Sequence, residues 1–309
     1  MLHNSEKDFI KRHIGPSEED QSKMLEKLNY KSLNDLIDNT VPEKIQFKGE
    51  LNIGEPNSEY EALRKLKAIS KKNHIYSNFI GMGYYGTYTP YVILRNILEN
   101  PGWYTSYTPY QPEVAQGRLE MLLNFQQMVV DFTGMDIANA SLLDEGTAAA
   151  EAMGLSYRLD KSDSNLVFVS ENCHPQTIEV IKTRAEPMGL KVLVGNEDKV
   201  LEQLKEDIVC GILQYPGTLG DIKDPSEAIS KIHKKNGKAI LACDLLALAK
   251  LKTPRELGAD IAVGSSQRFG IPMGYGGPHA AFFATKDEYK RSMPGRIVGV
   301  SVDRHGNTA

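Results

Sequence analysis

The sequence predicts an α/β fold, in which helices cover both faces of a mostly parallel sheet with one antiparallel strand, preceded by a helical N-terminal segment. Two patterns support this prediction. After Ala138, short apolar runs alternate with amphipathic helical stretches, which is typical of a parallel sheet buried on both faces. The last connection, Gly274 to Pro278, is too short for a helical crossover, so the strand that begins at His279 is expected to run antiparallel.

The helical N-terminal segment is predicted over residues 1–75. Ser17 is placed to cap its first helix, because a side-chain oxygen there accepts from a free backbone N–H. A second short helix is predicted over 32–38 and a third over 59–72, where apolar residues recur on one face. The Gly- and Pro-containing stretch 52–58 is the expected linker.

Residues 76–113 form a loop region that is rich in Tyr, Gly, Thr and Pro. Tyrosine combines apolar area with a hydroxyl group, so this region is interpreted as the wall of a site or as an interface. Packing of these rings in a seam between two domains is an equally open alternative. A long helix is predicted next, over 114–133, and Gly134 ends it. It opens the α/β region, which spans residues 114–309.

The α/β region is predicted as an alternating series of strands and helices. The predicted strands are 166–170, 191–194, 208–213, 238–243, 260–264 and 279–284. The predicted helices are 147–158, 175–184, 199–205 and 226–235. Connections of this length and type join neighbouring parallel strands.

The composition excludes several classes of protein. The net charge is −4 and no basic block is present, which disfavours a nucleic-acid surface or a polybasic membrane contact. No apolar run approaches the ~18 residues of a membrane span, and the N-terminus matches neither a signal peptide nor a transit peptide. The 3 cysteines match neither a zinc spacing nor a disulfide framework. We therefore expect a cytoplasmic protein with reduced thiols and without metal, nucleic-acid or membrane partners.

Two strand ends carry residues of a cofactor site. Asp244 follows one apolar strand, and Gln267 follows the next, ahead of a Gly-rich turn. In a pyridoxal phosphate (PLP) site, an Asp at this place keeps the pyridine nitrogen protonated, and a Lys carries the cofactor as a Schiff base. Here Gln267 stands where the Lys is expected. The pattern predicts the large domain of fold type I PLP enzymes, without covalent attachment of PLP at this position.

Two further motifs appear in the order that such a site requires. Gly146 and Thr147 open an Ala-rich helix, whose free N–H groups are where these enzymes place the PLP phosphate. Taken alone, this motif is better explained by an ordinary helix cap at Asp144. His174 follows a strand at the place where an aromatic ring covers the cofactor, and a satisfied core or surface histidine is its alternative.

The segment Gly81-Met-Gly-Tyr-Tyr-Gly86 matches the spacing of a dinucleotide-binding motif but lacks its context. Such a motif follows a strand, opens a helix and precedes an acidic residue about 20 positions on. Here Thr, Tyr, Thr and Pro90 follow instead. We interpret this segment as a flexible aromatic loop.

The most distinctive string is Tyr107-Thr108-Pro109-Tyr110-Gln111-Pro-Glu113. It reads as a rigid, Pro-bracketed aromatic loop that delivers a carboxylate to the N-terminus of the long helix. A purely structural cap accounts for the prolines, but it accounts less well for the clustered Tyr and Gln side chains.

Long strings of this chain resemble the P-protein of the glycine cleavage system, the glycine dehydrogenase (decarboxylating) family. The resembling strings are 9–16, 107–120, 139–152, 264–279 and 293–300, so the resemblance extends over essentially the whole chain. In that family, glycine is decarboxylated on PLP, and the aminomethyl group passes to the lipoyl arm of H-protein. The family consists of two similar halves, fused or separate, and only the C-terminal half has the Schiff-base Lys.

The resemblance identifies this chain with the N-terminal half and implies a supporting role. No catalytic residue is expected in this half, and PLP would be bound covalently by the C-terminal half. The expected support for that half's active site, across a pseudo-twofold interface, is Tyr107, Thr108, Pro109, Tyr110, Gln111 and Glu113. The expected vestigial cofactor pocket is Gly146, Thr147, His174, Asp244 and Gln267. A homodimer or a pseudo-tetramer of halves is implied.

Two departures and two alternatives accompany this identification. The chain stops at Ala309, before the smaller C-terminal lobe of such enzymes, and its strings resemble the long fused form, so a fragment without activity of its own is expected. One alternative is a non-catalytic scaffold or binding subunit of the same complex. The other is a different fold type I enzyme with Lys250 or Lys252 as its Schiff base, which their closeness to Asp244 disfavours.

Overall fold

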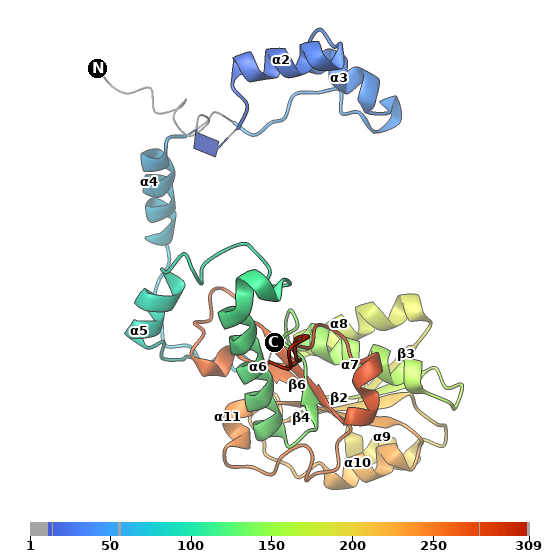
Figure 1. The fold of residues 1–309 in the computed structure, drawn as a ribbon. Coiled ribbons are helices and arrows are strands. Elements are labelled where there is room, and N and C mark those ends of the chain that lie inside the picture. The colour runs from blue at the N-terminus through green and yellow to red at the C-terminus, as the bar shows by residue number, and fades with distance from the viewer. Residues whose placement is uncertain (1–11, 14, 55–56, 278, 308–309) are drawn as a thin grey trace. The chain divides into compact units, whose positions relative to one another are not determined.

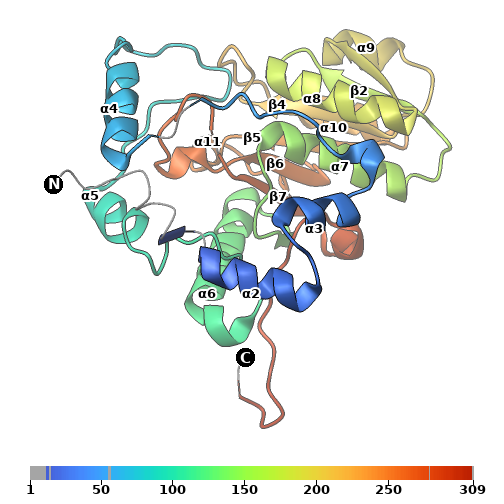
Figure 2. The ribbon, with the colours of Figure 1, turned by 90° about the horizontal axis from the view of Figure 1, so that it is seen from above.

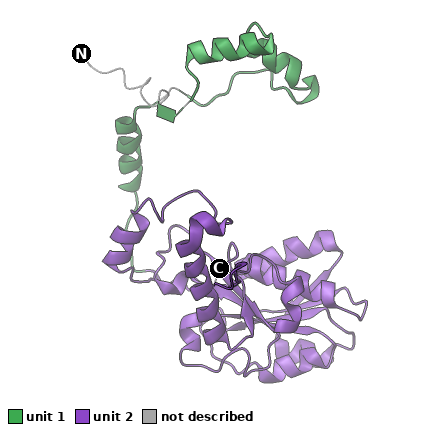
Figure 3. Ribbon diagram, in the orientation of Figure 1, with its two compact units in different colours: residues 1–77 green, residues 78–309 purple. Residues whose placement is uncertain are grey.

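The computed structural model describes residues 12–13, 15–54, 57–277 and 279–307. The string 9–16 and the expected linker 52–58 therefore lie partly outside the described residues. The chain divides into two compact units, residues 1–77 and residues 78–309 (Figure 3).

The first unit consists of helices and loops. Its elements are α2 (Glu18–Leu28), α3 (Leu33–Thr40), the 3₁₀ helix η1 (Glu43–Ile45) and α4 (Glu59–Ser70) (Figure 1). As predicted, Ser17 caps the first of these helices: its Oγ accepts from the Asp20 N–H at 3.1 Å, and the Asp20 carboxylate accepts from the Ser17 N–H at 3.1 Å. No described residue of this unit is buried. Caps and backbone hydrogen bonds therefore contribute more to these helices than a buried core does.

The second unit is built around a 7-stranded sheet with the strand order β1-β7-β6-β5-β4-β2-β3. The strands are β1 (Ile137–Ala138), β2 (Leu166–Ser170), β3 (Lys191–Gly195), β4 (Cys210–Tyr215), β5 (Lys238–Cys243), β6 (Ile261–Ser265) and β7 (Ala281–Thr285). Strands β2 to β6 pair in parallel, and β7 is antiparallel to both β6 and β1. The predicted fold is confirmed, including the reversed last strand. The short edge strand β1 was not predicted, because two residues show no periodicity.

Helices cover both faces of the sheet (Figure 1, Figure 2). The helices of this unit are α5 (Tyr91–Ile93), α6 (Pro112–Thr133), α7 (Glu145–Leu159), α8 (Pro175–Ala185), α9 (Glu197–Gln203), α10 (Ser226–His233) and α11 (Leu245–Leu248), of which α5 lies away from the sheet. The shorter helical turns are η2 (Leu94–Leu98), η3 (Glu186–Met188), η4 (Gln267–Phe269) and η5 (Asp287–Ser292). The predicted helices of this unit are confirmed, with bounds that differ by a few residues.

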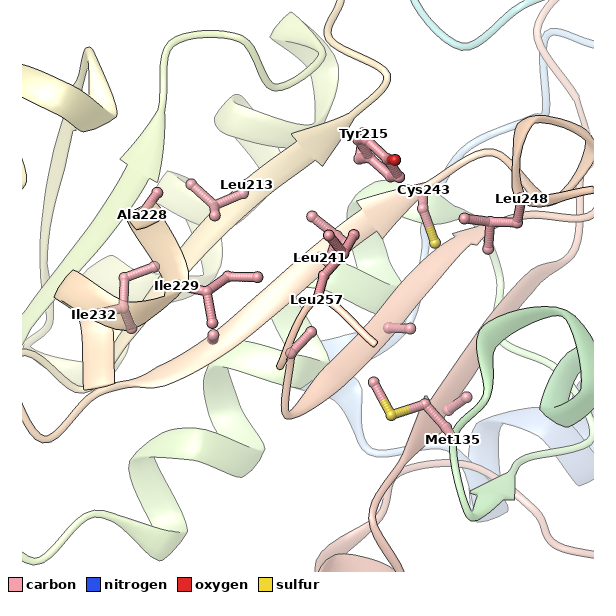
Figure 4. Close-up of a cluster of buried hydrophobic side chains, with 14 of the residues drawn as sticks. Met135, Leu213, Tyr215, Ala228, Ile229, Ile232, Leu241, Cys243, Leu248 and Leu257 are labelled. Carbon is pink, nitrogen blue, oxygen red and sulfur yellow. The ribbon is translucent and has the colours of Figure 1, made fainter. Parts of the chain in front are cut away.

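Strand alternation divides the buried side chains between two cores. On β5, Leu241 belongs to a cluster with residues of α6, α10 and α11, whereas Ile240 belongs to a cluster with residues of α7 and α8. Figure 4 shows part of the first cluster, where Ile229 and Ile232 of α10 face Leu213 and Leu241. Because apolar residues fill both faces, the polar residues of this sheet concentrate at the strand ends.

The helix α6 begins at Pro112 and ends at Gly134, which has a left-handed φ of 69°. Proline is favoured at the first helical position, since its missing N–H has no helical partner there. The helix is interrupted at Ala115, whose φ of −136° is not helical. No helix in the described part of the chain is long and apolar enough to cross a membrane.

Candidate functional site

The carboxyl ends of three parallel strands carry the residues of the predicted cofactor pocket. His174 follows β2, Asp244 follows β5 and Gln267 follows β6. In an open α/β sheet this edge is where ligands bind. His174 and Gly146 line a cavity of ≈ 220 Å³. His174 and Asp244 line a second cavity, of ≈ 20 Å³.

The amide of Gln267 is buried and fixed. Its Nε2 donates to the carbonyl oxygen of Tyr85 at 2.8 Å and to that of Ile271 at 2.7 Å. Its Oε1 is buried and has no hydrogen-bond partner among the described residues. This side chain therefore joins the segment around Tyr85 to the Gly-rich turn after β6. It presents no amine at the position where the Schiff-base Lys is expected from the sequence.

Asp244 is paired with a neighbouring cation. The Nε of Arg268 lies 3.0 Å from its Oδ2, and its Oδ1 accepts from the Leu246 N–H at 2.9 Å, which caps α11. The guanidinium of Arg268 also lies 4.2 Å from the centre of the Tyr85 ring, within range of a cation–π contact. The carboxylate predicted to face a pyridinium thus has a protein partner of opposite charge.

His174 is buried and covered by backbone. Its Nδ1 lies 2.5 Å from the hydroxyl of Thr218. Gly83 has a left-handed φ of +85°, and a Cβ added there would lie 2.9 Å from the imidazole Cδ2. Burial lowers the pKa of His174 to about 4, so the ring is neutral near pH 7. The segment around Gly83 therefore lies against the ring that was predicted to cover the cofactor.

The N-terminus of α7 is capped by its own acid. The Oδ1 of Asp144 accepts from the Thr147 N–H at 2.7 Å, so the ordinary helix cap considered as the alternative for this motif is present. Glu145 lies 3.8 Å from His174, measured from Oε1 to Nε2. Burial raises the pKa of Glu145 to about 7, although a hydrogen bond from Gln214 offsets part of this effect. The two groups are therefore not a strong ion pair at neutral pH.

These residues do not fit PLP. The cavity between His174 and Asp244 has ≈ 20 Å³, which is room for about one water molecule. The larger cavity is lined by Asp144 and Glu145 as well as by His174 and His279, so a phosphate group there would meet two carboxyl groups and neither a Lys nor an Arg. With an amide at Gln267, the pocket offers no amine for a Schiff base at this residue, and the cavity beside Asp244 has no space for the pyridine ring.

Residues 78–90 cover this strand edge and are hydrogen-bonded to it. That the segment 81–86 is a flexible loop stays a prediction. The Nε2 of Gln176 donates to the carbonyl oxygen of Met82 at 2.7 Å. The Thr87 hydroxyl donates to the carbonyl oxygen of Ile271 at 2.8 Å. The loop is held by side chains far from it in sequence, and these partners are not visible in its local composition.

The loop 107–113 lies apart from both cavities, since none of its residues lines either of them. The Tyr107 hydroxyl donates to Gln111 Oε1 at 2.7 Å, and Glu113 lies in the first turn of α6. Tyr107 and Tyr110 are 49% and 69% exposed. Thr108, Gln111 and Glu113 are exposed as well, and Pro109 is half-buried.

The remaining candidates have other positions. Lys252 pairs with Asp224 at 3.2 Å on the surface, and neither Lys250 nor Lys252 lines the two cavities. Cys173, Cys210 and Cys243 are buried and unbridged in this structure. Within the described residues, no group of His, Cys, Asp and Glu is arranged to hold a metal ion.

Sequence reasoning missed four residues of this site, namely Gly83, Tyr85, Glu145 and Arg268. Two of them have signals in the sequence. Arg268 directly follows the position of the expected Lys, and Glu145 directly precedes the Gly-Thr motif. Gly83 and Tyr85 have none, because their contacts are long-range.

Known proteins resemble this chain over its whole length. The model of the glycine cleavage system P-protein family matches residues 11–309. The chain is similar to a glycine dehydrogenase (decarboxylating) of Pelagibacter ubique, with 83% identity over 100% of this chain and 32% of that protein. A protein of the same name from Synechocystis sp. is 60% identical over 97% of this chain and 30% of its own length. The chain thus spans about a third of the length of these relatives.

A solved structure is also similar to this chain. It is a crystal structure of glycine decarboxylase (P-protein) of the glycine cleavage system in inhibitor-bound form. The TM-score is 0.84 and the sequence identity 34%, over 95% of this chain and 67% of that chain.

Proposed function

Because this chain belongs to the glycine cleavage system P-protein family, we propose that it is the N-terminal part of a glycine decarboxylase. The complete protein would decarboxylate glycine and pass the aminomethyl group to the lipoyl arm of H-protein. PLP would supply the electron sink of this reaction, bound covalently to the C-terminal half. This part would then support catalysis without performing it.

The observation that carries this division of roles is the side chain of Gln267. It stands at the position of the Schiff-base Lys, and its two amide hydrogens are engaged by backbone carbonyl groups. The pairing of Asp244 with Arg268 supports the same conclusion, since a pyridinium would have to compete with a guanidinium for the carboxylate. The pocket of this half is therefore proposed to be structural.

The loop 107–113 is proposed to face the active site of the C-terminal half. It presents two exposed tyrosines, an exposed amide and an exposed carboxylate, and it lies apart from this half's own pocket. Aromatic side chains with polar ends are favoured in interfaces, because they combine apolar area with hydrogen-bonding groups. In the complete enzyme these groups would be covered and would contact the substrate or the residues that hold it.

The proposed partners are the C-terminal half, lipoylated H-protein and glycine, in a homodimer or a pseudo-tetramer of halves. To test the reaction, this chain and the C-terminal half are assayed separately and together with PLP, H-protein and labelled glycine. We expect release of labelled CO2 only from the mixture, and a borohydride-trapped PLP adduct only on the C-terminal half. A specific adduct on this chain alone would contradict the role given to Gln267.

The loop has its own test in the complete enzyme. Tyr110→Phe and Glu113→Gln should each lower kcat/KM for glycine about 10- to 100-fold, because a displaced positioning group has effects of this size. Tyr157→Phe is the control, since Tyr157 is exposed at the far end of α7 from its Gly-Thr motif. The scaffold alternative predicts unchanged kcat/KM in all three variants and binding of H-protein to this chain without the C-terminal half.

A further inference from the structure

A C-terminal strap, residues 293–298, is hydrogen-bonded to buried side chains of the α/β unit. The amide of Gln126, on α6, donates to the carbonyl oxygen of Val298 and accepts from its N–H, both at 2.8 Å. The Nδ2 of Asn139 donates to the carbonyl oxygen of Pro294 at 3.2 Å. Gln126 is 7% exposed and Asn139 is fully buried. Both ends of the strap are thus fixed by amides that have little freedom to move.

A glycine determines the path of the strap between these two points. Gly295 has a left-handed φ of +78°, and a Cβ added there would lie 2.8 Å from Asn139 Nδ2. Any side chain would add backbone strain and a collision with a buried amide. The next residue, Arg296, is then fixed by its backbone, because its carbonyl oxygen accepts from the Ala140 N–H at 2.7 Å.

The side chain of Arg296 binds the loop 107–111 from the strap side. Its guanidinium donates to the carbonyl oxygens of Pro109 and Tyr110, the latter at 3.4 Å, and lies 5.0 Å from the centre of the Tyr110 ring. A second arginine acts from α6, where Arg118 Nη1 donates to the carbonyl oxygen of Tyr107 at 2.6 Å. A planar guanidinium holds two carbonyl groups in a fixed fork and stacks on a ring face, whereas an ammonium group is a point charge without this geometry.

The loop depends on these contacts more than on apolar packing. Tyr107 and Tyr110 are largely exposed in this chain, so their rings bury little area that would define one conformation. The prolines restrict the backbone locally, but they do not fix where the rings point. Hydrogen bonds to the loop carbonyl groups therefore select the conformation.

We propose that Arg296 is a positioning residue for glycine decarboxylation: it fixes the conformation in which the loop 107–111 presents Tyr107 and Tyr110. This inference rests on the proposed function, in which the loop faces the active site of the C-terminal half. Arg296 acts through the loop, and the backbone of the strap 293–298 positions its side chain beside Pro109 and Tyr110.

The test compares Arg296→Ala, Arg296→Lys and the control Arg158→Ala in the complete enzyme. Arg158 donates a guanidinium hydrogen to the carbonyl oxygen of Ser292 at 2.9 Å, so it holds the same C-terminal segment without touching the loop. For each variant, hydrogen exchange of residues 104–111, the Tm, and kcat and KM for glycine are measured.

With Arg296→Ala we expect faster exchange in residues 104–111 and a fall of kcat/KM of about 10- to 100-fold. Arg296→Lys should recover only part of the loss, because it restores the charge but not the planar fork. Arg158→Ala should leave exchange in the loop and kcat/KM unchanged, with a Tm change similar to that of Arg296→Ala.

The outcomes separate this inference from the proposed function. Unchanged loop exchange in Arg296→Ala would overturn the positioning role, whatever the activity. Equal losses of activity in the Arg296 and Arg158 variants, in step with Tm, would also overturn it, since both would then act through stability. Faster loop exchange with unchanged kcat/KM would show that Arg296 fixes the loop conformation. It would overturn the function proposed for the loop.

Discussion

Arg268 lies between Asp244 and the ring of Tyr85: its Nε is 3.0 Å from the carboxylate Oδ2, and its guanidinium carbon is 4.2 Å from the ring centre. The carboxylate at the end of β5 is therefore neutralised from within the chain. The covering segment 78–90 takes part in the same arrangement, because Tyr85 also accepts a hydrogen bond from Gln267 through its carbonyl oxygen. The Asp244–Arg268 pair and the ≈ 20 Å³ of the cavity beside it support the proposal that this half does not bind PLP covalently.

Restoring the amine alone should not restore cofactor binding. In Gln267→Lys incubated with PLP, we expect no stoichiometric covalent adduct after borohydride reduction, as measured by mass spectrometry of the digested chain. The cavity beside Asp244 has only ≈ 20 Å³, and Arg268 remains paired with that carboxylate. A stoichiometric adduct on the introduced side chain would show that the missing amine was the sole obstacle.

Removing the guanidinium of Arg268 should destabilise the folded chain. In Arg268→Ala, Asp244 remains as a mostly buried carboxylate without its charged partner, and the free energy of unfolding should fall by about 1–3 kcal/mol. Urea unfolding measures this value. In Asp244→Asn combined with Arg268→Ala, the loss should be smaller than the sum of the single losses, because no unpaired charge is left. Strict additivity would contradict a functional pairing of the two side chains.

Substitutions at two glycines of the segment 78–90 separate the cost of backbone strain from the cost of a steric contact. Gly81 and Gly83 both have a left-handed φ, +65° and +85°, but only a Cβ at Gly83 would meet His174, at 2.9 Å. Gly81→Ala should cost about 1 kcal/mol for the backbone conformation alone. Gly83→Ala should cost about 1–3 kcal/mol more, because the segment has to move off the imidazole. Equal losses in the free energy of unfolding, measured with urea, would mean that the segment 78–90 is not in close contact with His174.

Glu145 should make stability depend on pH. The pKa of its carboxyl is raised to about 7 in the folded chain, from 4.5, so the native state binds more protons than the unfolded state between these pH values. The stability contributed by this group is present below pH 4.5 and is lost as pH rises through about 7. The maximum effect is on the order of 3 kcal/mol.

Replacing the Glu145 carboxyl should remove its contribution to the pH dependence of stability. Glu145→Gln should match the wild type near pH 5 and exceed it in free energy of unfolding near pH 8. His174 acts in the opposite direction, because its lowered pKa makes stability fall as pH falls from 6.5 to about 4. The difference between variant and wild type isolates the carboxyl. A difference that is constant from pH 5 to pH 8 would contradict its burial as a neutral acid.

Much of the fold was predictable because its patterns are local. The apolar runs of β2 and β5 end where predicted, and the short connection before β7 specified its reversed direction. Ser17 and Gly134 marked the ends of α2 and α6 by the ordinary rules of helix caps. The edge strand β1 was missed, because it exists only through pairing with β7.

The sequence by itself determined the α/β order of elements, the amide at position 267 and the arrival of His174, Asp244 and Gln267 at one edge of the sheet. Each of these follows from local periodicity and from the rule that parallel strands end on the same side. The tertiary structure decided what happens at that edge. The contacts of Gly83 with His174, of Tyr85 with Arg268 and of Arg296 with the loop at Tyr110 join residues far apart in the chain. Such contacts form only when the whole chain has folded, and no local pattern encodes them.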